Sequence, residues 1–479
     1  MLTFLVLLRF SNLLADLPLE FGDRIHFAYT DEGWWTRNAV AIVRQGHWYI
    51  DDGYNPIVYL PVVPLLQTLW FELFGANLLA ARSFTAICSI ILAWLIYQLV
   101  YRFFASDLAL LAPLVILSHF SIFVHSRLAL LEIPTLVFIL VTLLLILSRQ
   151  GEVSNFRAIL ATFVLFAAIL TKTTAIFALP MVILFIWFQK QTLANKVRQI
   201  SIILSIFLIA FLAIGFFLLA SNSLSFEYFS STNILTKLHG DFVSVLIAPV
   251  RILFRALQVF PILFPLFLFS VLILIAVPKY RSNPLILLVI FWAGTSFLVL
   301  SLSDYAPARY MMVFCVPIAI VVPLIVDFVF TTFEGKIYRQ AILCILLLCL
   351  GINIAKQINY FASLKYSFVN MAEDVGQYIR QHDRHSKVLM GHFADSVSLV
   401  NDLKSVNDRI GHQDLDYRIK KFDPGYYISL GKIRPEIINS LINYYNLELL
   451  KTYNVYDNSI EGKPVLFYRL DPLQNNLPN

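Results

Sequence analysis

Charged side chains are scarce in this sequence: Asp, Glu, Lys and Arg make up 14% of its 479 residues, whereas 59% are hydrophobic. Soluble domains typically contain about 25% charged residues, so this composition excludes an ordinary soluble protein. Apolar runs recur from the N-terminus to about residue 356, and each is close to the roughly 20 residues that cross a bilayer as a helix. We therefore predict a multi-pass α-helical membrane protein.

Cysteine is also rare, and none of the four cysteines lies in the polar C-terminal tail. They stand inside apolar runs, at Cys88, Cys315, Cys344 and Cys349. This placement argues against a disulfide framework and against a metal site with Cys/His spacing. The sequence also has no Gly-rich phosphate loop, internal repeat or low-complexity tract. We expect no cofactor and no metal, although the composition alone leaves a divalent ion open.

The net charge is +6, from 36 basic and 30 acidic residues. In a membrane protein, such an excess is explained by lysine and arginine in cytoplasmic loops, so no nucleic-acid partner is predicted. Five alternate loops hold the basic residues: Arg102; Arg149 and Arg157; Lys190, Lys196 and Arg198; Lys279 and Arg281; Lys336 and Arg339. All five fall on one side if the N-terminus is cytoplasmic, which places the tail from about residue 360 outside the cell membrane.

Eleven segments are candidate spans, with boundaries uncertain by several residues. They are residues 1–16, 78–101, 107–125, 128–148, 157–171, 173–189, 199–220, 246–277, 284–302, 309–332 and 340–357. The first fifteen residues lack a small-residue cleavage site, so they are expected to remain as the first helix. A shorter apolar stretch, 56–74, contains Pro56, Pro61 and Pro64 and is expected to be an interfacial or re-entrant helix.

The tail differs in character from the rest of the chain. Residues 387–393, 426–431, 447–456 and 463–470 have the pattern of strands, and residues 366–382 and 434–446 have that of helices. We therefore predict two domains: a transmembrane catalytic domain over residues 1–357 and a small extracytoplasmic α/β domain over residues 358–479.

Ionisable residues gather at the outer ends of the predicted spans, where such groups are costly to bury and usually mark a function. They are Asp31 and Glu32 in the first outer loop, Glu132 close to Arg127, Lys172, and Asp304 with Arg309. Each has a simpler explanation, since Lys172 and Arg309 could extend to head groups and Glu132 could only pair with Arg127. Together, acids and bases at one membrane depth suit chemistry on a lipid phosphate. The bases hold the phosphate by charge-assisted hydrogen bonds, and a carboxylate deprotonates the incoming hydroxyl or amine.

Several stretches around these residues share the motifs of one enzyme family. They are DEGWW (31–35) with AVAIVRQGHWYI (39–50), YLPVVPLLQTLWFELFGANLLAARSFTAICS (59–89) with Gly75 and Arg82, RLALLEIPTLVF (127–138), AILTKTTAIFALP (168–180) and ARYMMVFCVPIAIVVPL (308–324). This set resembles the GT-C-type glycosyltransferases that use polyprenyl-phosphate sugars. The resemblance is to the protein O-mannosyltransferases and the aminoarabinose transferases that modify lipid A (glycosyltransferase family 39-like). It covers about the first 330 residues.

The resemblance implies a GT-C fold and an inverting reaction without a covalent sugar–enzyme intermediate. It implies that Asp31, with Glu32 as the competitor, activates the acceptor, and that Glu132 orients the acceptor or supports the base. Lys172 and Arg309 would neutralise the leaving phosphate. The weaker candidates for substrate binding are Trp34, Arg37, Arg127 and Asp304. Aminoarabinose transferases commonly have arginine after DEG, where this chain has Trp34, which argues against transfer of aminoarabinose to lipid A.

The expected function is therefore transfer of a sugar from a polyprenyl-phosphate donor to a lipid, glycan or protein acceptor at the extracytoplasmic face. A transporter or flippase is the alternative, but such proteins place charges near the midplane and have inverted repeats. A scaffold whose outer domain recruits partners is a second alternative. Turnover of a polyprenyl-phosphate sugar by the purified protein separates the enzyme from both. The sugar, the acceptor and the oligomeric state are not determined by the sequence.

The basic loops generate a testable topology. Reporter fusions at Asn195 and Asn401 are expected to report a cytoplasmic and an extracytoplasmic location, respectively, because the positive-inside bias sets orientation. A cytoplasmic signal at Asn401 would refute the predicted location of the active site.

Overall fold

The structure is a computed structural model that describes residues 1–17, 26–47, 60–104, 106–147, 153–189, 191–220, 242–281, 283–302, 306–382, 385–408, 415–455 and 463–473. The chain divides into two compact units. The helical unit comprises Met1–Leu8, Ile87–His125 and Leu131–Asn359, and the α/β unit comprises Arg9–Ala86, Ser126–Leu130 and Tyr360–Asn479. Each unit is described by itself.

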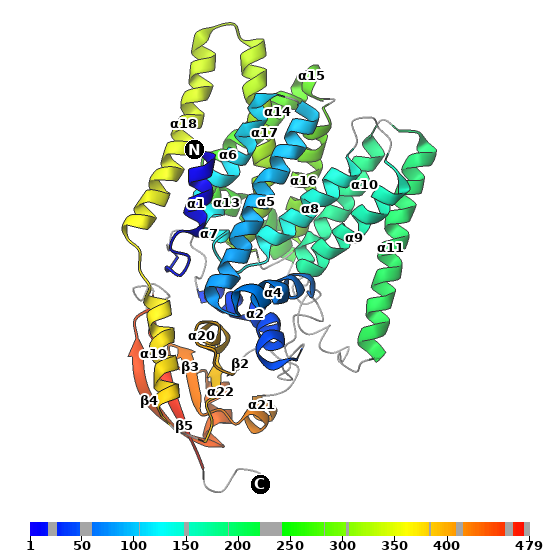
Figure 1. The fold of residues 1–479 in the computed structure, drawn as a ribbon. Helices are drawn as coiled ribbons and strands as arrows, with labels where there is room; N and C mark the ends of the chain where they lie inside the picture. The colour runs from blue at the N-terminus through cyan, green and yellow to red at the C-terminus, as the bar shows by residue number, and fades with distance from the viewer. Residues whose placement is uncertain are drawn as a thin grey trace. The chain divides into compact units, whose positions relative to one another are not determined.

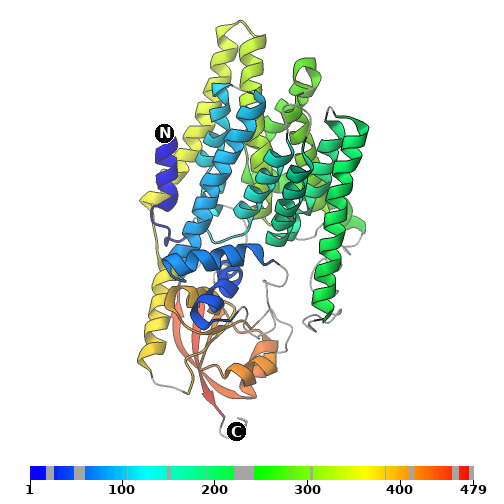
Figure 2. The ribbon, with the colours of Figure 1, turned by 45° about the vertical axis from the view of Figure 1, so that its right-hand side comes forward.

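The helical unit contains the predicted apolar segments, and Figure 1 and Figure 2 show α17 and α18 as neighbouring helices joined by a short turn. Its elements, together with the ends of α1, α5 and α18 that extend beyond it, are α1 (Leu2–Phe10), α5 (Leu78–Phe104), η1 (Asp107–Leu110), α6 (Leu111–Ser118), α7 (Phe120–His125), α8 (Glu132–Ile146), α9 (Asn155–Thr171), η2 (Thr173–Phe177), α10 (Ala178–Phe188), α11 (Leu193–Ala220), α13 (Phe242–Val259), α14 (Leu263–Ala276), α15 (Pro278–Arg281), α16 (Pro284–Ser301), η3 (Ala308–Phe314), α17 (Cys315–Thr332) and α18 (Lys336–Ala362).

The predicted number of eleven spans is not confirmed, although the predicted membrane class is. Among the described residues, five helices are long and apolar enough to cross a membrane, in α5, α11, α16, η3 with α17, and α18, and a sixth is obtained if α13 and α14 form one bent span. The other apolar helices have 10–17 residues. The first helix ends at Phe10 and is shorter than the predicted span 1–16.

Two predicted spans are broken. Residues 246–277 form α13 and α14, which are bent by 113°; the break includes Pro261, which has no N–H for a helical hydrogen bond. Residues 107–125 are interrupted at His119, whose backbone is extended. Side chains of α18 satisfy the backbone groups at that second break: Asn353 Oδ1 accepts from Phe120 N at 2.8 Å, and Gln357 Nε2 donates to Ser118 O at 2.6 Å. Breaks at membrane depth require such partners.

In the α/β unit, the DEGWW stretch is helical, so its prediction as a loop was wrong. It lies within α2 (His26–Gln45), and the predicted interfacial helix is α4 (Val62–Phe74), which begins after Pro61. The residues of α2 show little apolar excess, but Ala39 belongs to the same core as Phe71 of α4 and Val397 of the tail. Tertiary packing, rather than helix propensity, stabilises α2.

The tail forms the predicted α/β structure around a five-stranded sheet with strand order β2-β1-β3-β5-β4. The elements are α19 (Ser367–Gln381), β1 (Leu389–Gly391), α20 (Ala394–Asn401), β2 (Ser405–Val406), α21 (Leu415–Phe422), β3 (Tyr426–Leu430), α22 (Pro435–Ile442), β4 (Tyr445–Tyr453) and β5 (Val465–Pro472). β1 is parallel to β2 and β3, whereas β5 is antiparallel to β3 and β4. Sequence alone predicted neither β2, α20 nor α21, which are all short.

Helices cover both faces of this sheet (Figure 1). Residues of α19 and α20 share a core with Leu389 and Ile428, whereas residues of α21 and α22 share another with Met390 and Tyr427. This alternation follows from the two-residue period of strands.

The tail is not a compact unit by itself. The Asp16 carboxylate accepts hydrogen bonds from Ser367 N and Ser367 Oγ at 2.8 and 2.6 Å, and from Phe368 N at 3.2 Å, at the first turn of α19. A residue about 350 positions away thus satisfies N–H groups that a helix cannot satisfy internally. The functional boundary at residue 358 stays a prediction.

Candidate functional site

In the helical unit, Glu132, Lys172 and Arg309 form one charged cluster. Lys172 Nζ donates to Glu132 Oε1, and Arg309 Nε lies 3.3 Å from the same oxygen. The three side chains are 6–13% exposed. The structure therefore brings together three of the residues predicted from the sequence.

Interruptions in three helical segments place these residues. Glu132 is the first residue of α8, Lys172 has an extended backbone between α9 and η2, and Arg309 lies in the 3₁₀ segment η3 before α17. Because 3₁₀ turns are used in short pieces at helix ends, the polar residues are presented at the ends of apolar helices. The carboxylate at the start of α8 also complements the positive end of that helix.

A pocket opens beside the cluster. Its polar wall includes Glu132, Lys172 and Tyr310, and its apolar wall includes Leu136 and Leu300. Lys172 Nζ lies 4.2 Å from the centroid of the Tyr310 ring, a cation–π contact that fixes the ammonium at the pocket. An apolar cavity with a cation at its edge suits a molecule that has an apolar chain and an anionic head.

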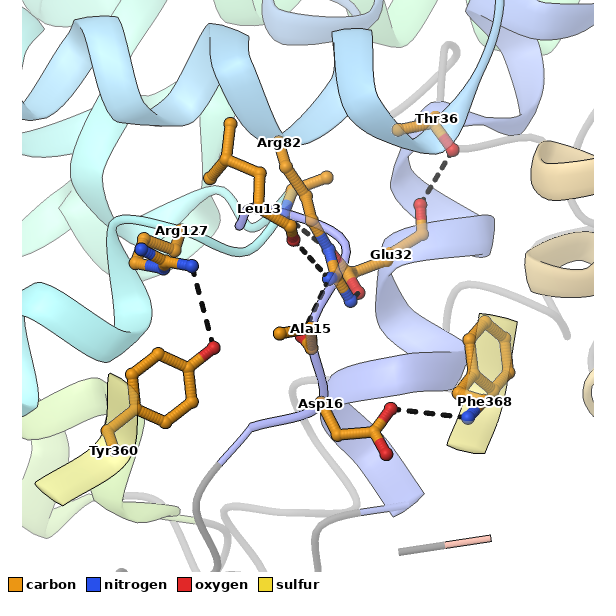
Figure 3. Close-up of polar contacts among 10 residues, drawn as sticks. Leu13, Ala15, Asp16, Glu32, Thr36, Arg82, Arg127, Tyr360 and Phe368 are labelled. Carbon is orange, nitrogen blue, oxygen red and sulfur yellow. Dashed lines mark hydrogen bonds and ion pairs between the residues drawn. The ribbon is translucent and has the colours of Figure 1, made fainter. Parts of the chain in front are cut away.

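In the α/β unit, Glu32 is held by Arg82 (Figure 3). Arg82 Nε donates to Glu32 Oε1 at 2.9 Å and Nη2 donates to Oε2 at 2.8 Å. Glu32 Oε1 also accepts from Ala129 N at 2.8 Å. Glu32 and Arg82 are 1% and 2% exposed. Both carboxylate oxygens are thus engaged in a buried bidentate pair, which is a strong geometry for Arg and a carboxylate.

Asp31 precedes Glu32 in α2 and is 4% exposed. Successive residues of a helix are rotated by about 100°, so Asp31 does not share the face that Glu32 turns toward Arg82. Trp34 contacts His392 edge-on with ring centroids 5.3 Å apart, and Arg37 Nη1 lies 3.8 Å from Asp395 Oδ2. Asp304 lies outside the described residues.

Arg127 has a structural environment within the α/β unit. Its Nη2 donates to Asn12 O at 2.8 Å, and its guanidinium lies 5.3 Å from the ring centroids of Tyr360 and Phe361. Burial lowers the pKa of Arg127 to about 10, and the nearby Tyr360 opposes this shift. Arg127 therefore stays protonated at neutral pH and ties residues 126–130 to the start of the tail.

Sequence reasoning missed the roles of Tyr310 and Asp395. Tyr310 directly follows Arg309 in the RYMM motif, and an aromatic residue next to a predicted cation could have suggested a cation–π contact at the site. No signal was available for Asp395, because its partner Arg37 is more than 350 residues away. The described residues contain no group of three or more His, Cys, Asp and Glu arranged to hold a metal ion, and the expected absence of a metal stays a prediction.

The Glu32–Arg82 pair yields a stability prediction. Arg82→Met is expected to destabilise the folded protein by about 3–5 kcal/mol, because it leaves a buried carboxylate without its partner. The measurement is thermal or denaturant unfolding of the purified protein. Arg469→Met is the matched control, since Arg469 pairs with the half-exposed Glu448 and such pairs contribute about 0–1 kcal/mol. Equal losses in the two variants would contradict the assigned importance of the buried pair.

Comparison with known proteins agrees with the motifs. Residues 55–216 match the family model of dolichyl-phosphate-mannose-protein mannosyltransferase. No curated protein matches the sequence.

Solved structures resemble this chain over nearly its whole length. ArnT from Cupriavidus metallidurans, bound to undecaprenyl phosphate, is 14% identical with a TM-score of 0.62, covering 97% of this chain and 96% of that one. The apo state of the same protein gives a TM-score of 0.63 at 14% identity, with 97% of each chain covered. The Archaeoglobus fulgidus oligosaccharyltransferase, tethered with an acceptor peptide containing the NVT sequon, is 10% identical with a TM-score of 0.55, covering 100% of this chain and 74% of that one. At these identities the structures establish the fold. With the family-model match over residues 55–216, they confirm the predicted resemblance to the GT-C-type membrane glycosyltransferases.

Proposed function

We propose that this protein transfers a sugar, with inversion, from a polyprenyl-phosphate donor to an acceptor at the extracytoplasmic face of the membrane. The cluster of Glu132, Lys172 and Arg309 beside an apolar pocket carries this proposal. Two cations of the cluster, Lys172 and Arg309, lie at the same carboxylate oxygen. A phosphodiester that joins a sugar to a polyprenyl chain carries one negative charge, which lysine and arginine bind by charge-assisted hydrogen bonds.

The same cluster suits the reaction step. When the bond between the anomeric carbon and the phosphate oxygen breaks, the leaving polyprenyl phosphate gains negative charge. Lys172 and Arg309 stabilise that charge, and stabilising charge as it develops is usually the largest catalytic contribution. Glu132 holds both cations in place, which is a more specific role than orienting the acceptor.

Asp31 acts as the base in this proposal. Its carboxylate takes the proton of the acceptor hydroxyl or amine while the acceptor atom bonds to the anomeric carbon on the face opposite the phosphate. Glu32 is less suited, because Arg82 and Ala129 N already engage its two oxygens. The orientation with the tail outside, the donor and the acceptor are all parts of the proposal; the donor is supported by the resemblance to ArnT, whose structure contains undecaprenyl phosphate.

A first prediction concerns the phosphate. Lys172→Met is expected to weaken binding of undecaprenyl phosphate, used as the probe, by roughly ten- to a hundredfold, because one charge-assisted hydrogen bond contributes about 1.5–3 kcal/mol. Titration of the purified protein measures the change, and Arg309→Met should behave alike. Lys279→Met is the control, because that lysine is 64% exposed and pairs with Asp327 at 3.4 Å. Binding that survives in both cluster variants would show that head-group contacts, not the donor, explain these cations.

A second prediction concerns the base. Asp31→Asn is expected to lower kcat by about 10²–10⁴-fold with little change in donor KM, because asparagine keeps the size but cannot accept the proton. The lipid-linked sugar that accumulates in cells lacking the protein serves as donor in the transfer assay.

Glu32→Gln is the comparison variant and should lose stability rather than turnover per folded molecule. Near-normal transfer by Asp31→Asn, together with loss in Glu32→Gln, would reverse the two roles. Full transfer activity of both variants would contradict the assignment of the base to this acid pair.

A further inference from the structure

The carboxyl edge of β1 has the geometry at which α/β sheets bind their ligands. β1 lies between two parallel neighbours, and the segment after β1 leads to α20, which covers one face of the sheet. The segment after β3 leads to α22, which covers the other face. In open α/β sheets, ligands bind at the carboxyl ends of two adjacent strands when the segment after one strand runs to one face of the sheet and the segment after the other runs to the opposite face.

Here a helix of the same chain packs at that edge. A Cβ atom added at Gly33 of α2 would lie 2.4 Å from Ser396 N and 2.7 Å from the carbonyl carbon of Asp395. Only glycine allows this approach to the backbone of α20. The ring of Trp34 also contacts His392, the residue directly after β1. Figure 1 shows α2 next to α20.

Charged groups hold the same face of α2. Arg37 Nη1 lies 3.8 Å from Asp395 Oδ2, and both side chains are at most 4% exposed. Asp395 Oδ1 accepts from Ser405 Oγ at 2.8 Å, which fixes that carboxylate. In the last turn of α2, Arg44 pairs with Asp402 at 2.8 Å and donates to Ser398 O at 3.0 Å.

Helix geometry relates this contact to the base. At about 100° per residue, positions 33, 37 and 44 lie within roughly 40° of one another, whereas position 31 lies about 160° from Gly33. The contacts that Gly33, Arg37 and Arg44 make with the tail therefore lie away from the side of α2 that carries Asp31. A roll or shift of α2 on α20 would move the Asp31 carboxylate directly.

We propose that α20 is a positioning element for catalysis and that Gly33, Arg37 and Asp395 are positioning residues that act through Asp31. The inference rests on the proposed function and assigns a role to the tail in it. The tail sets the location of the base, because a displacement of about 1 Å can cost roughly a hundredfold in rate. Helix α2 thus occupies the position at the carboxyl edge of β1 where other α/β sheets bind a small-molecule ligand.

The test compares Asp395→Asn, Arg37→Gln, their double variant and Gly33→Ala in the full-length protein. Each single variant that folds is expected to lower kcat by about ten- to a hundredfold with an unchanged donor KM. The double variant should be no worse than either single variant, because the two residues act as one pair. Asp374→Asn is the control: Asp374 lies in the tail and pairs with Lys451 at 2.8 Å, away from α2.

The pH profile separates positioning from base chemistry. In Asp395→Asn, activity should rise with pH at the wild-type midpoint but to a lower plateau, whereas Asp31→Asn should lose that acidic limb. Wild-type kcat in the folded Asp395→Asn and Arg37→Gln variants would overturn the proposal. So would an equal loss of kcat in Asp374→Asn, which would mean that any damage to the tail suffices. Absence of sugar transfer by the wild-type protein would instead refute the proposed function itself.

Discussion

The guanidinium of Arg82 joins stretches of the α/β unit that are far apart in the sequence. It donates to the Glu32 carboxylate and to the backbone carbonyls of Leu13 and Ala15, and Glu32 in turn accepts from Ala129 N. Arginine suits this position because its donors form a planar fork that bonds in several directions at once. A buried pair of this kind repays its desolvation only when its remaining donors and acceptors are satisfied, as they are here. Asp16, next to Ala15, then anchors the first turn of α19.

In the helical unit, one carboxylate lies beside two cations. Lys172 and Arg309 both approach Glu132 Oε1 at the edge of an apolar pocket. In the α/β unit, by contrast, one guanidinium engages both oxygens of Glu32. The two glutamates that the sequence offered as catalytic candidates, Glu32 and Glu132, thus differ in the number and arrangement of their basic partners.

Much of this architecture was predictable, because apolar length and two-residue alternation are local properties. The segments at α5, α9 and α16, and the strands β3 and β5, appear close to their predicted bounds. The helical state of the DEGWW stretch was not predictable, since α2 is stabilised by the core that its Ala39 shares with Phe71 and Val397, which only the fold provides. The Lys172–Glu132–Arg309 cluster was predicted as a group from membrane depth. The engagement of Glu32 by Arg82 was not, because a motif gives the presence of both residues but not their pairing.

The break between α6 and α7 has a consequence for biosynthesis. At this break, Phe120 N and Ser118 O bond to the side chains of Asn353 and Gln357. These partners lie 233 and 239 positions later in the chain. When α6 and α7 leave the ribosome, α18 does not yet exist, and unsatisfied N–H and C=O groups are costly in lipid. The nascent segment must therefore keep water or a surrogate partner at these groups until the last apolar helix arrives. The hydrogen bonds of this break are therefore completed only after α18 is synthesised. A chain truncated before α18 would keep Phe120 N and Ser118 O without these partners.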